Sequence, residues 1–112
     1  MTIDELIREA HKTAQEKGWW SQDERPVLMQ LPEKIALMHS ELSEALEEYR
    51  GGRSAYWETA EGKPEGIGVE LADCIIRIAD YCGALGIDLE RCLAKKLAYN
   101  KTRPFRHGGR KA

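Results

Sequence analysis

The stretch 67–82 constrains the fold most, because its apolar side chains would cover nearly the whole circumference of a helix. At about 100° per residue, such a helix is buried on most sides, and the rest of the chain must pack around it. The apolar residues are Ile67, Val69, Leu71, Ala72, Cys74, Ile75, Ile76, Ile78, Ala79, Tyr81 and Cys82. The charged residues, Glu70, Asp73, Arg77 and Asp80, are spaced by 3, 4 and 3 and share one stripe. This stripe is either a narrow solvated edge or the lining of a site inside a helical bundle.

Three further segments show apolar side chains at three- and four-residue spacing, which is typical of amphipathic helices. The pattern predicts helices over about 2–17, 32–50, 66–83 and 88–102. Thr2 and Glu5 have the form of a capping box, and Asp88 is the expected N-cap of the last helix. No internal repeat or long strand-like alternation is present, so we predict an all-α, four-helix bundle-like fold.

The remaining segments are predicted to be a connector, a loop and a tail without regular secondary structure. Residues 19–30 form an irregular connector, and residues 51–65 are rich in glycine and polar residues and are predicted to be a loop. Tyr56 and Trp57 within that loop would either cover a ligand as a lid or anchor the loop to the core. Residues 104–112 form a basic tail. A chain of 112 residues has the length of a single domain, here 1–112.

Composition and cysteine usage indicate a cytoplasmic protein. The mean hydropathy is -0.56, and no apolar run approaches the roughly 20 residues that a membrane span requires. The first residues also lack the pattern of a signal peptide. Cys74, Cys82 and Cys92 lie in apolar stretches without a C-x-x-C pair, so we expect reduced thiols. We expect no membrane partner.

The net charge of -2 is the sum of two opposed parts. Residues 1–90 hold all 19 acids and 9 bases, whereas residues 91–112 hold 8 bases and no acid. Charge segregated in this way indicates a function for both parts.

Acidic residues also recur at helical spacing in the segment 32–50. Glu41, Glu44 and Glu48 follow at intervals of 3 and 4, on the flank of its apolar face. Two helices that each offer a pair of acids can surround one hard cation, such as Mg²⁺ or Mn²⁺, with carboxylate oxygens. The alternative is that these acids lie on solvated helix faces.

The two acid pairs resemble a known family signature. Glu41-Leu-Ser-Glu44, followed after 25 residues by Glu70-Leu-Ala-Asp73, resembles the E-x-x-E…E-x-x-D pattern of the MazG-like nucleotide pyrophosphohydrolases. The resemblance covers most of the chain from about residue 33. It implies hydrolysis of a nucleoside triphosphate to the monophosphate and pyrophosphate, in the housekeeping of nucleotide pools.

By this resemblance Glu41, Glu44, Glu70 and Asp73 would bind Mg²⁺, with Mn²⁺ as a substitute. Either Glu41 or Glu44 would be the catalytic residue that activates water, and Glu48 is a spare ligand or base. The family assembles as dimers or dimers of dimers, and the apolar helix 66–83 also favours an oligomer.

Substrate contacts are predicted in the basic segment and the connector. Lys96, Asn100, Lys101 and Arg103 follow the acidic helices and would meet the phosphates. Trp19 and Trp20 would point about 100° apart in a helix, so that one stacks on a base while the other packs, and we assign Trp20 to the substrate. Arg77 would pair with Asp73 or Asp80, or reach a phosphate.

Two other readings remain. In the first, the chain would be a catalytically idle helical adaptor, in which the acid stripes pair with the basic segment of a neighbouring subunit. In the second, the basic segment would bind a nucleic acid. The net charge of -10 on residues 1–90 opposes a polyanion, so a nucleic acid polymer is the less favoured partner.

Overall fold

The computed structural model describes residues 1–111, and of residue 107 the backbone alone. The elements are α1 (Ile3–Glu16), the 3₁₀ helix η1 (Val27–Gln30), α2 (Leu31–Arg50), β1 (Trp57–Glu58), β2 (Pro64–Glu65), α3 (Ile67–Leu85), α4 (Leu89–Thr102) and α5 (Arg106–Gly109). The predicted all-α class is confirmed, and the four predicted helices correspond to α1, α2, α3 and α4.

The ends of the helices follow from their capping residues. Thr2 Oγ1 accepts a hydrogen bond from the backbone N–H of Glu5 at 3.0 Å, and Asp88 Oδ1 accepts one from Arg91 at 3.1 Å. Both predicted N-caps are therefore confirmed. Helix α3 continues to Leu85, two residues beyond the predicted end near residue 83. Gly86, in the left-handed region with a φ of 78°, ends it.

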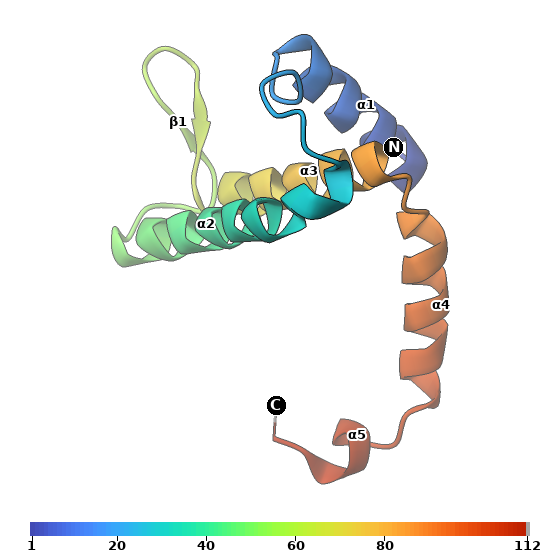
Figure 1. Cartoon of the computed structure of the whole chain (residues 1–112). Helices are drawn as coiled ribbons and strands as arrows, with labels where there is room; N and C mark the ends of the chain where they lie inside the picture. Colours follow the sequence, from blue (N-terminus) through green and yellow to red (C-terminus); the bar gives the residue numbers. More distant parts are fainter. Residues whose placement is uncertain (112) are drawn as a thin grey trace.

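Helix α3 is the central element, with α1 and α2 packed against it (Figure 1). A Cβ at Gly83 would lie 2.7 Å from the Cβ of His11, so glycine permits the close approach of α1. The buried apolar residues are Ala10, Ala45, Cys74, Ala79, Tyr81 and Cys82. Two covering helices leave Ile75 53% and Leu71 44% exposed. The expectation that this helix is buried on most sides is therefore wrong for a single chain.

Helix α4 does not complete a four-helix bundle within one chain. It projects away from α2 and α3 (Figure 1), and none of its residues is buried. Its packing is against α1. The predicted bundle is therefore a three-helix body with one projecting helix. As a consequence, Leu93 and Leu97 of α4 stay 40% and 59% exposed.

The segment 51–65 contains a small antiparallel hairpin and is not only a loop. Trp57 pairs with Glu65 and Glu58 with Pro64. Strands of two residues are too short to show alternation, which is why the sequence pattern did not predict them. The indole Nε1 of Trp57 donates a hydrogen bond to Glu48 Oε2 at 3.2 Å. Trp57 therefore anchors the hairpin to α2.

The basic tail holds one short helix, α5, which begins at Arg106 with a φ of 51°. Residue 112, the end of the predicted tail, lies outside the described residues. Over residues 1–111, no helix has both the length and the apolar character needed to cross a bilayer.

Candidate metal centre

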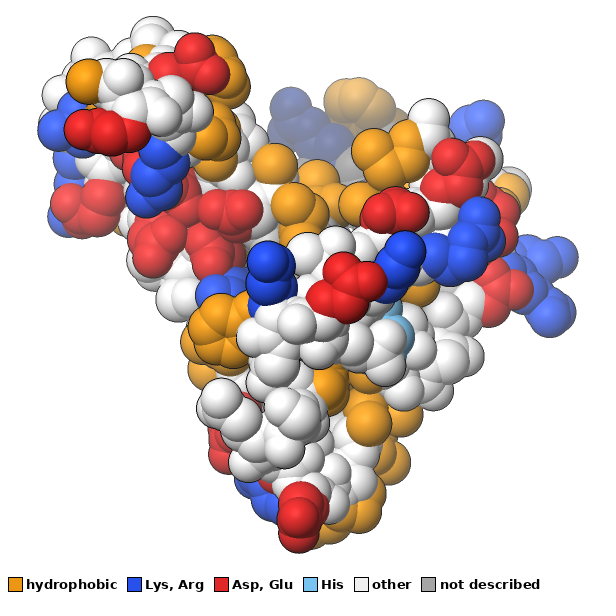
Figure 2. All heavy atoms as spheres, turned by 90° about the horizontal axis from the view of Figure 1, so that it is seen from above, with side chains coloured by type: hydrophobic (Ala, Val, Ile, Leu, Met, Phe, Trp, Pro, Cys, Tyr) orange, Lys and Arg blue, Asp and Glu red, His pale blue; other side chains and the backbone are white. Residues whose placement is uncertain are grey.

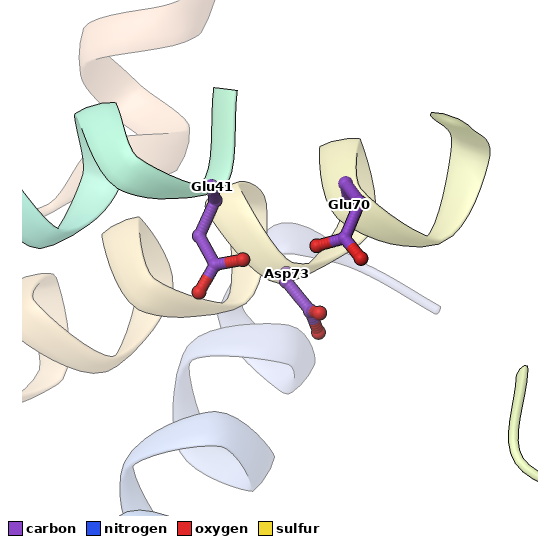
Figure 3. A group of neighbouring side chains, drawn as sticks. All are labelled: Glu41, Glu70 and Asp73. Carbon is purple, nitrogen blue, oxygen red and sulfur yellow. The ribbon is translucent and has the colours of Figure 1, made fainter. Parts of the chain in front are cut away.

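Carboxylates from α2 and α3 converge between the two helices. Figure 3 shows Glu41 on α2, with Glu70 and Asp73 on α3, and each of them offers one oxygen within 4.8 Å of the other two. The positions follow from helical spacing, because Glu70 and Asp73 are one turn apart on the face that meets α2. Glu41 is only 6% exposed and Glu70 only 8%. Acids this buried are rare in proteins unless they are paired or bind a cation.

Glu44 completes the predicted set of acids. It is exposed, but its carboxylate lies close enough to Glu70 to raise the pKa of that residue. Figure 2 shows acidic side chains gathered on the side of the molecule that carries the hairpin. The structure therefore brings Glu41, Glu70 and Asp73 together, and Glu44 adjoins Glu41 and Glu70 at the exposed edge of this group.

Glu70 has the most perturbed environment of the four. Burial, followed by the hydrogen bond and negative charge of Glu44 and by the neighbouring Glu41 and Asp73, raises its pKa to about 7. Its Oε2 atom is buried and has no hydrogen-bond partner among the described residues. A buried carboxylate oxygen without a donor is costly, and a cation would supply the missing partner.

Arg77 pairs with Glu41, a partner that the sequence analysis did not consider. Its Nε donates to Glu41 Oε1 at 2.7 Å. Burial would raise the pKa of Glu41, but the hydrogen bonds from Arg77 and from the neighbouring carboxyl groups outweigh burial and hold this pKa below its ordinary value. Burial and the charge of Glu41 raise the pKa of Asp73. Arg77 therefore favours the ionised form of Glu41.

These groups fit a hard divalent cation. Carboxylate oxygens are the ligands that Mg²⁺ and Mn²⁺ prefer, and the unpartnered Oε2 of Glu70 marks the point where positive charge is missing. The residues that would hold the ion are Glu41, Glu44, Glu70 and Asp73.

The stability of the metal-free chain should fall as pH rises from about 4.5 to about 7. In this window the folded chain keeps a proton on Glu70, which ionises near 7, whereas the unfolded chain, with the ordinary value of 4.5, has released it. The folded state therefore binds more protons, and the free energy of unfolding decreases with pH. Urea denaturation without divalent cations, at several pH values, measures this. The Glu70→Gln variant serves as the reference for all other groups, and parallel pH curves for the two proteins would contradict the prediction.

A cavity of about 690 Å³ adjoins the acid cluster. It lies between α1, α2 and α3, and Glu41, Asp73 and Arg77 form part of its wall. Lys17, Lys34 and Trp19 also line it. Its volume suits a small-molecule ligand. The sequence analysis did not single out these two lysines, which share the cavity wall with the acids, and the Nζ of Lys34 lies 4.3 Å from the centre of the Trp20 ring. Lys34 lies seven residues before Glu41, on the same helix face, and this spacing was the available signal.

The two adjacent tryptophans have different surroundings. Trp20 Nε1 donates to Asp80 Oδ1 at 2.8 Å, and the ring packs near Tyr81 with a centroid distance of 6.4 Å. His11 Nδ1 contacts the same Asp80 oxygen at 2.8 Å. Trp20, which we assigned to the substrate, thus joins the connector to α3, whereas Trp19 is 70% exposed and lines the cavity.

The predicted phosphate contacts on α4 do not meet the acids within one chain. Lys96 and Arg103 lie near the ring of Tyr99, with their charged groups 5.3 Å and 5.9 Å from its centroid. Asn100 and Lys101 follow on the same exposed helix. None of these four residues lines the cavity beside the acid cluster.

Comparisons of the chain with protein-family models, with curated proteins and with solved structures found no match. The case for a function therefore rests on the geometry and electrostatics of the site itself.

Proposed function

We propose that this protein is a divalent-cation-dependent nucleoside triphosphate pyrophosphohydrolase with a MazG-like fold, which cleaves a ribo- or deoxyribonucleoside triphosphate to the monophosphate and pyrophosphate. The observation that carries the proposal is the cluster of Glu41, Glu70 and Asp73 around an unpartnered buried oxygen, beside a cavity of about 690 Å³. A cation held by these carboxylates would neutralise phosphate charge and polarise the phosphoanhydride.

Glu44 is the better candidate for the residue that accepts a proton from the attacking water. Arg77 holds Glu41 ionised and lowers its pKa, which makes Glu41 a weak base. Glu44 is exposed and adjoins Glu70, so it has access to solvent and to the cluster. The reaction adds water across the bond between the α and β phosphates. A proton of the water passes to the carboxylate of Glu44, and pyrophosphate leaves.

Residues that line the cavity could contact the remaining phosphates and the base of the nucleotide. Lys17 and Lys34 carry positive charge in its wall, where they can offset phosphate charge that the cation does not neutralise. Trp19 presents an exposed indole that can stack on a base. We therefore assign base stacking to Trp19 in place of Trp20, whose N–H is held by Asp80.

The helical adaptor is the second candidate. It is favoured by the position of α4, whose cations lie outside the cavity and are free to pair with acids of another subunit. The proposed enzyme releases pyrophosphate from a nucleoside triphosphate, whereas an adaptor releases none.

A panel of canonical and damaged nucleoside triphosphates tests the proposal. Each is incubated with Mg²⁺ or Mn²⁺, and pyrophosphate and orthophosphate are measured separately. We expect pyrophosphate with the monophosphate from at least one nucleotide, and no release with a chelator. Orthophosphate without pyrophosphate would contradict the proposal, since it would indicate a different hydrolase. No product from any nucleotide would contradict the proposal and favour the adaptor.

We expect the chain to form at least a dimer, either a homodimer or a dimer of dimers. Large exposed apolar side chains on α2 and α3 exceed what a monomer usually presents, and they are Ile35, Leu42, Leu46, Tyr49, Leu71 and Ile75. A second copy would bury them, and it is also the route by which α4 cations could approach acids. Light scattering at micromolar concentration measures the mass. Leu46→Glu should shift it toward the monomer with helicity retained, and a monomeric native chain would contradict the prediction.

A further inference from the structure

Asp80 on α3 lines the cavity, but the proposed reaction leaves it without a role. Its Oδ1 accepts a hydrogen bond of 2.8 Å from Nε1 of Trp20 and lies 2.8 Å from Nδ1 of His11. The side chain of Asp80 is only 19% exposed. His11 belongs to α1 and Trp20 to the connector, so this one oxygen joins three segments of the chain.

The Trp20 ring that Asp80 holds contacts three further side chains. His11 meets the ring edge-on, with a centroid distance of 5.7 Å, and Tyr81 lies at 6.4 Å. Lys34 Nζ lies 4.3 Å from the ring centre, a distance at which an ammonium group is attracted to the ring face. Lys34 is half-buried and belongs to the cavity wall. The ring of Trp20 is therefore the surface on which the ammonium group of Lys34 rests.

The position of Trp19 depends on the same anchor. Its backbone N–H donates to the carbonyl oxygen of Ala14 at 3.0 Å, which ties it to the end of α1. The next residue, Trp20, is fastened to α3 by its hydrogen bond to Asp80. Trp19 is thus fixed on both sides, and its exposed indole lines the cavity. Loss of the bond to Asp80 would release one of these two attachments.

We propose that Asp80 is a positioning residue that acts through Trp20. The bond between them fixes Trp19 and Lys34 in the cavity wall, where the base and the phosphates of the nucleotide would lie. The indole N–H is half-buried, and a donor that leaves water without an acceptor is costly, so the oxygen of Asp80 is needed. The placement of the two side chains stands by itself. Its use in nucleotide binding rests on the proposed function.

Fluorine NMR of the chain labelled with 5-fluorotryptophan tests the placement without any nucleotide. The chain has three tryptophans, and replacement of each in turn by phenylalanine assigns the three signals. Asp80→Leu, which removes the acceptor, should shift the signals of both Trp19 and Trp20. Trp57, whose indole is hydrogen-bonded to Glu48, is the internal control and its signal should not move. Asp80→Asn keeps an acceptor oxygen and should return the Trp19 signal toward its native position.

Kinetics on the nucleotide that the panel identifies tests the use of this placement. Asp80→Leu should raise KM by about 10-fold and leave kcat within about threefold, because contacts to substrate are lost while the acid cluster is unchanged. Asp80→Asn should recover most of this loss. A residue that only stabilises the fold would not raise KM selectively.

Trp20→Phe approaches the same bond from its other end and serves if Asp80→Leu does not fold. It removes the indole N–H and keeps an aromatic ring, so it should shift the Trp19 signal and raise KM in the same direction. The double variant should raise KM no more than the larger single effect, since both changes break one bond. Circular dichroism shows that each variant keeps its helices.

A Trp19 signal that stays in its native position in Asp80→Leu and in Trp20→Phe would overturn the inference. If the signals shift as expected but the native chain hydrolyses no nucleotide, the placement by Asp80 stands and the proposed function fails. If the native chain releases pyrophosphate and Asp80→Leu keeps the native KM, the proposed function stands and the positioning role fails.

Discussion

Asp73→Asn and Glu44→Gln should each reduce pyrophosphate release by about 100-fold or more. Asn at position 73 keeps the shape of the side chain but removes one of the negative charges that would hold the cation. Glu44→Gln replaces the carboxylate by a neutral amide, which cannot take a proton from the attacking water. Steady-state release of pyrophosphate with saturating Mg²⁺ measures both effects, on the nucleotide that the panel identifies.

Glu47→Gln is the matched control for these variants. It lies on the same helix as Glu44, its side chain is 70% exposed, and its partner Arg50 is equally outside the site. Its activity should equal that of the native protein. Near-native activity in Asp73→Asn at the same Mg²⁺ concentration would show that the cation is held elsewhere, and near-native activity in Glu44→Gln would remove the proposed base.

Glu70→Gln should stabilise the metal-free chain at pH 8 while it abolishes stabilisation by Mg²⁺. Above its pKa of about 7, Glu70 is a buried charge surrounded by carboxylates, and the neutral amide removes this repulsion. We expect a gain of roughly 1–3 kcal/mol in the free energy of unfolding, since one pKa unit corresponds to about 1.4 kcal/mol. At pH 4 the two proteins should differ little, because Glu70 is then protonated.

Urea denaturation at pH 4 and pH 8, with and without Mg²⁺, measures both parts of this prediction. Glu47→Gln should change the stability by less than about 0.5 kcal/mol, as is usual for an exposed site. A Glu70→Gln variant that is less stable than the native chain at pH 8 would mean that the carboxylate is satisfied without a cation. A variant that Mg²⁺ still stabilises as strongly would place the ion away from Glu70.

These two predictions concern opposite effects of one group of side chains. The acids that would make the chain active also make it less stable when no cation is bound. Such a cost is typical of functional sites, where local requirements of stability and of chemistry conflict.

Local features of the sequence predicted most of the secondary structure. Helical periodicity predicted α1 to α4, and the capping residues Thr2 and Asp88 lie where they were expected. The spacing of Glu41 with Glu44, and of Glu70 with Asp73, predicted that each pair shares a helix face. Periodicity could not detect the two-residue strands around residues 57 and 65, because so short a segment shows no alternation.

The site itself was only partly predictable. The acids converge as expected, but Arg77 contacts Glu41, which is 36 residues away along the chain. The choice between Trp19 and Trp20 also depended on packing. Their side chains diverge by a large angle, and only the position of Asp80 on the neighbouring helix shows which of the two is held.

The opposed charges of the two parts of the chain also show what the sequence determines by itself and what depends on the tertiary structure. Spacing along a helix is set by 3.6 residues per turn, so the order of residues is enough to say which acids share a face and which segment is basic. Contacts between helices depend on their packing and on the loops that join them. The folded chain therefore gathers the acids of α2 and α3 and carries the cations of α4 away from them. It pairs Arg77 with Glu41 and places Lys17 and Lys34 in the wall of the adjoining cavity.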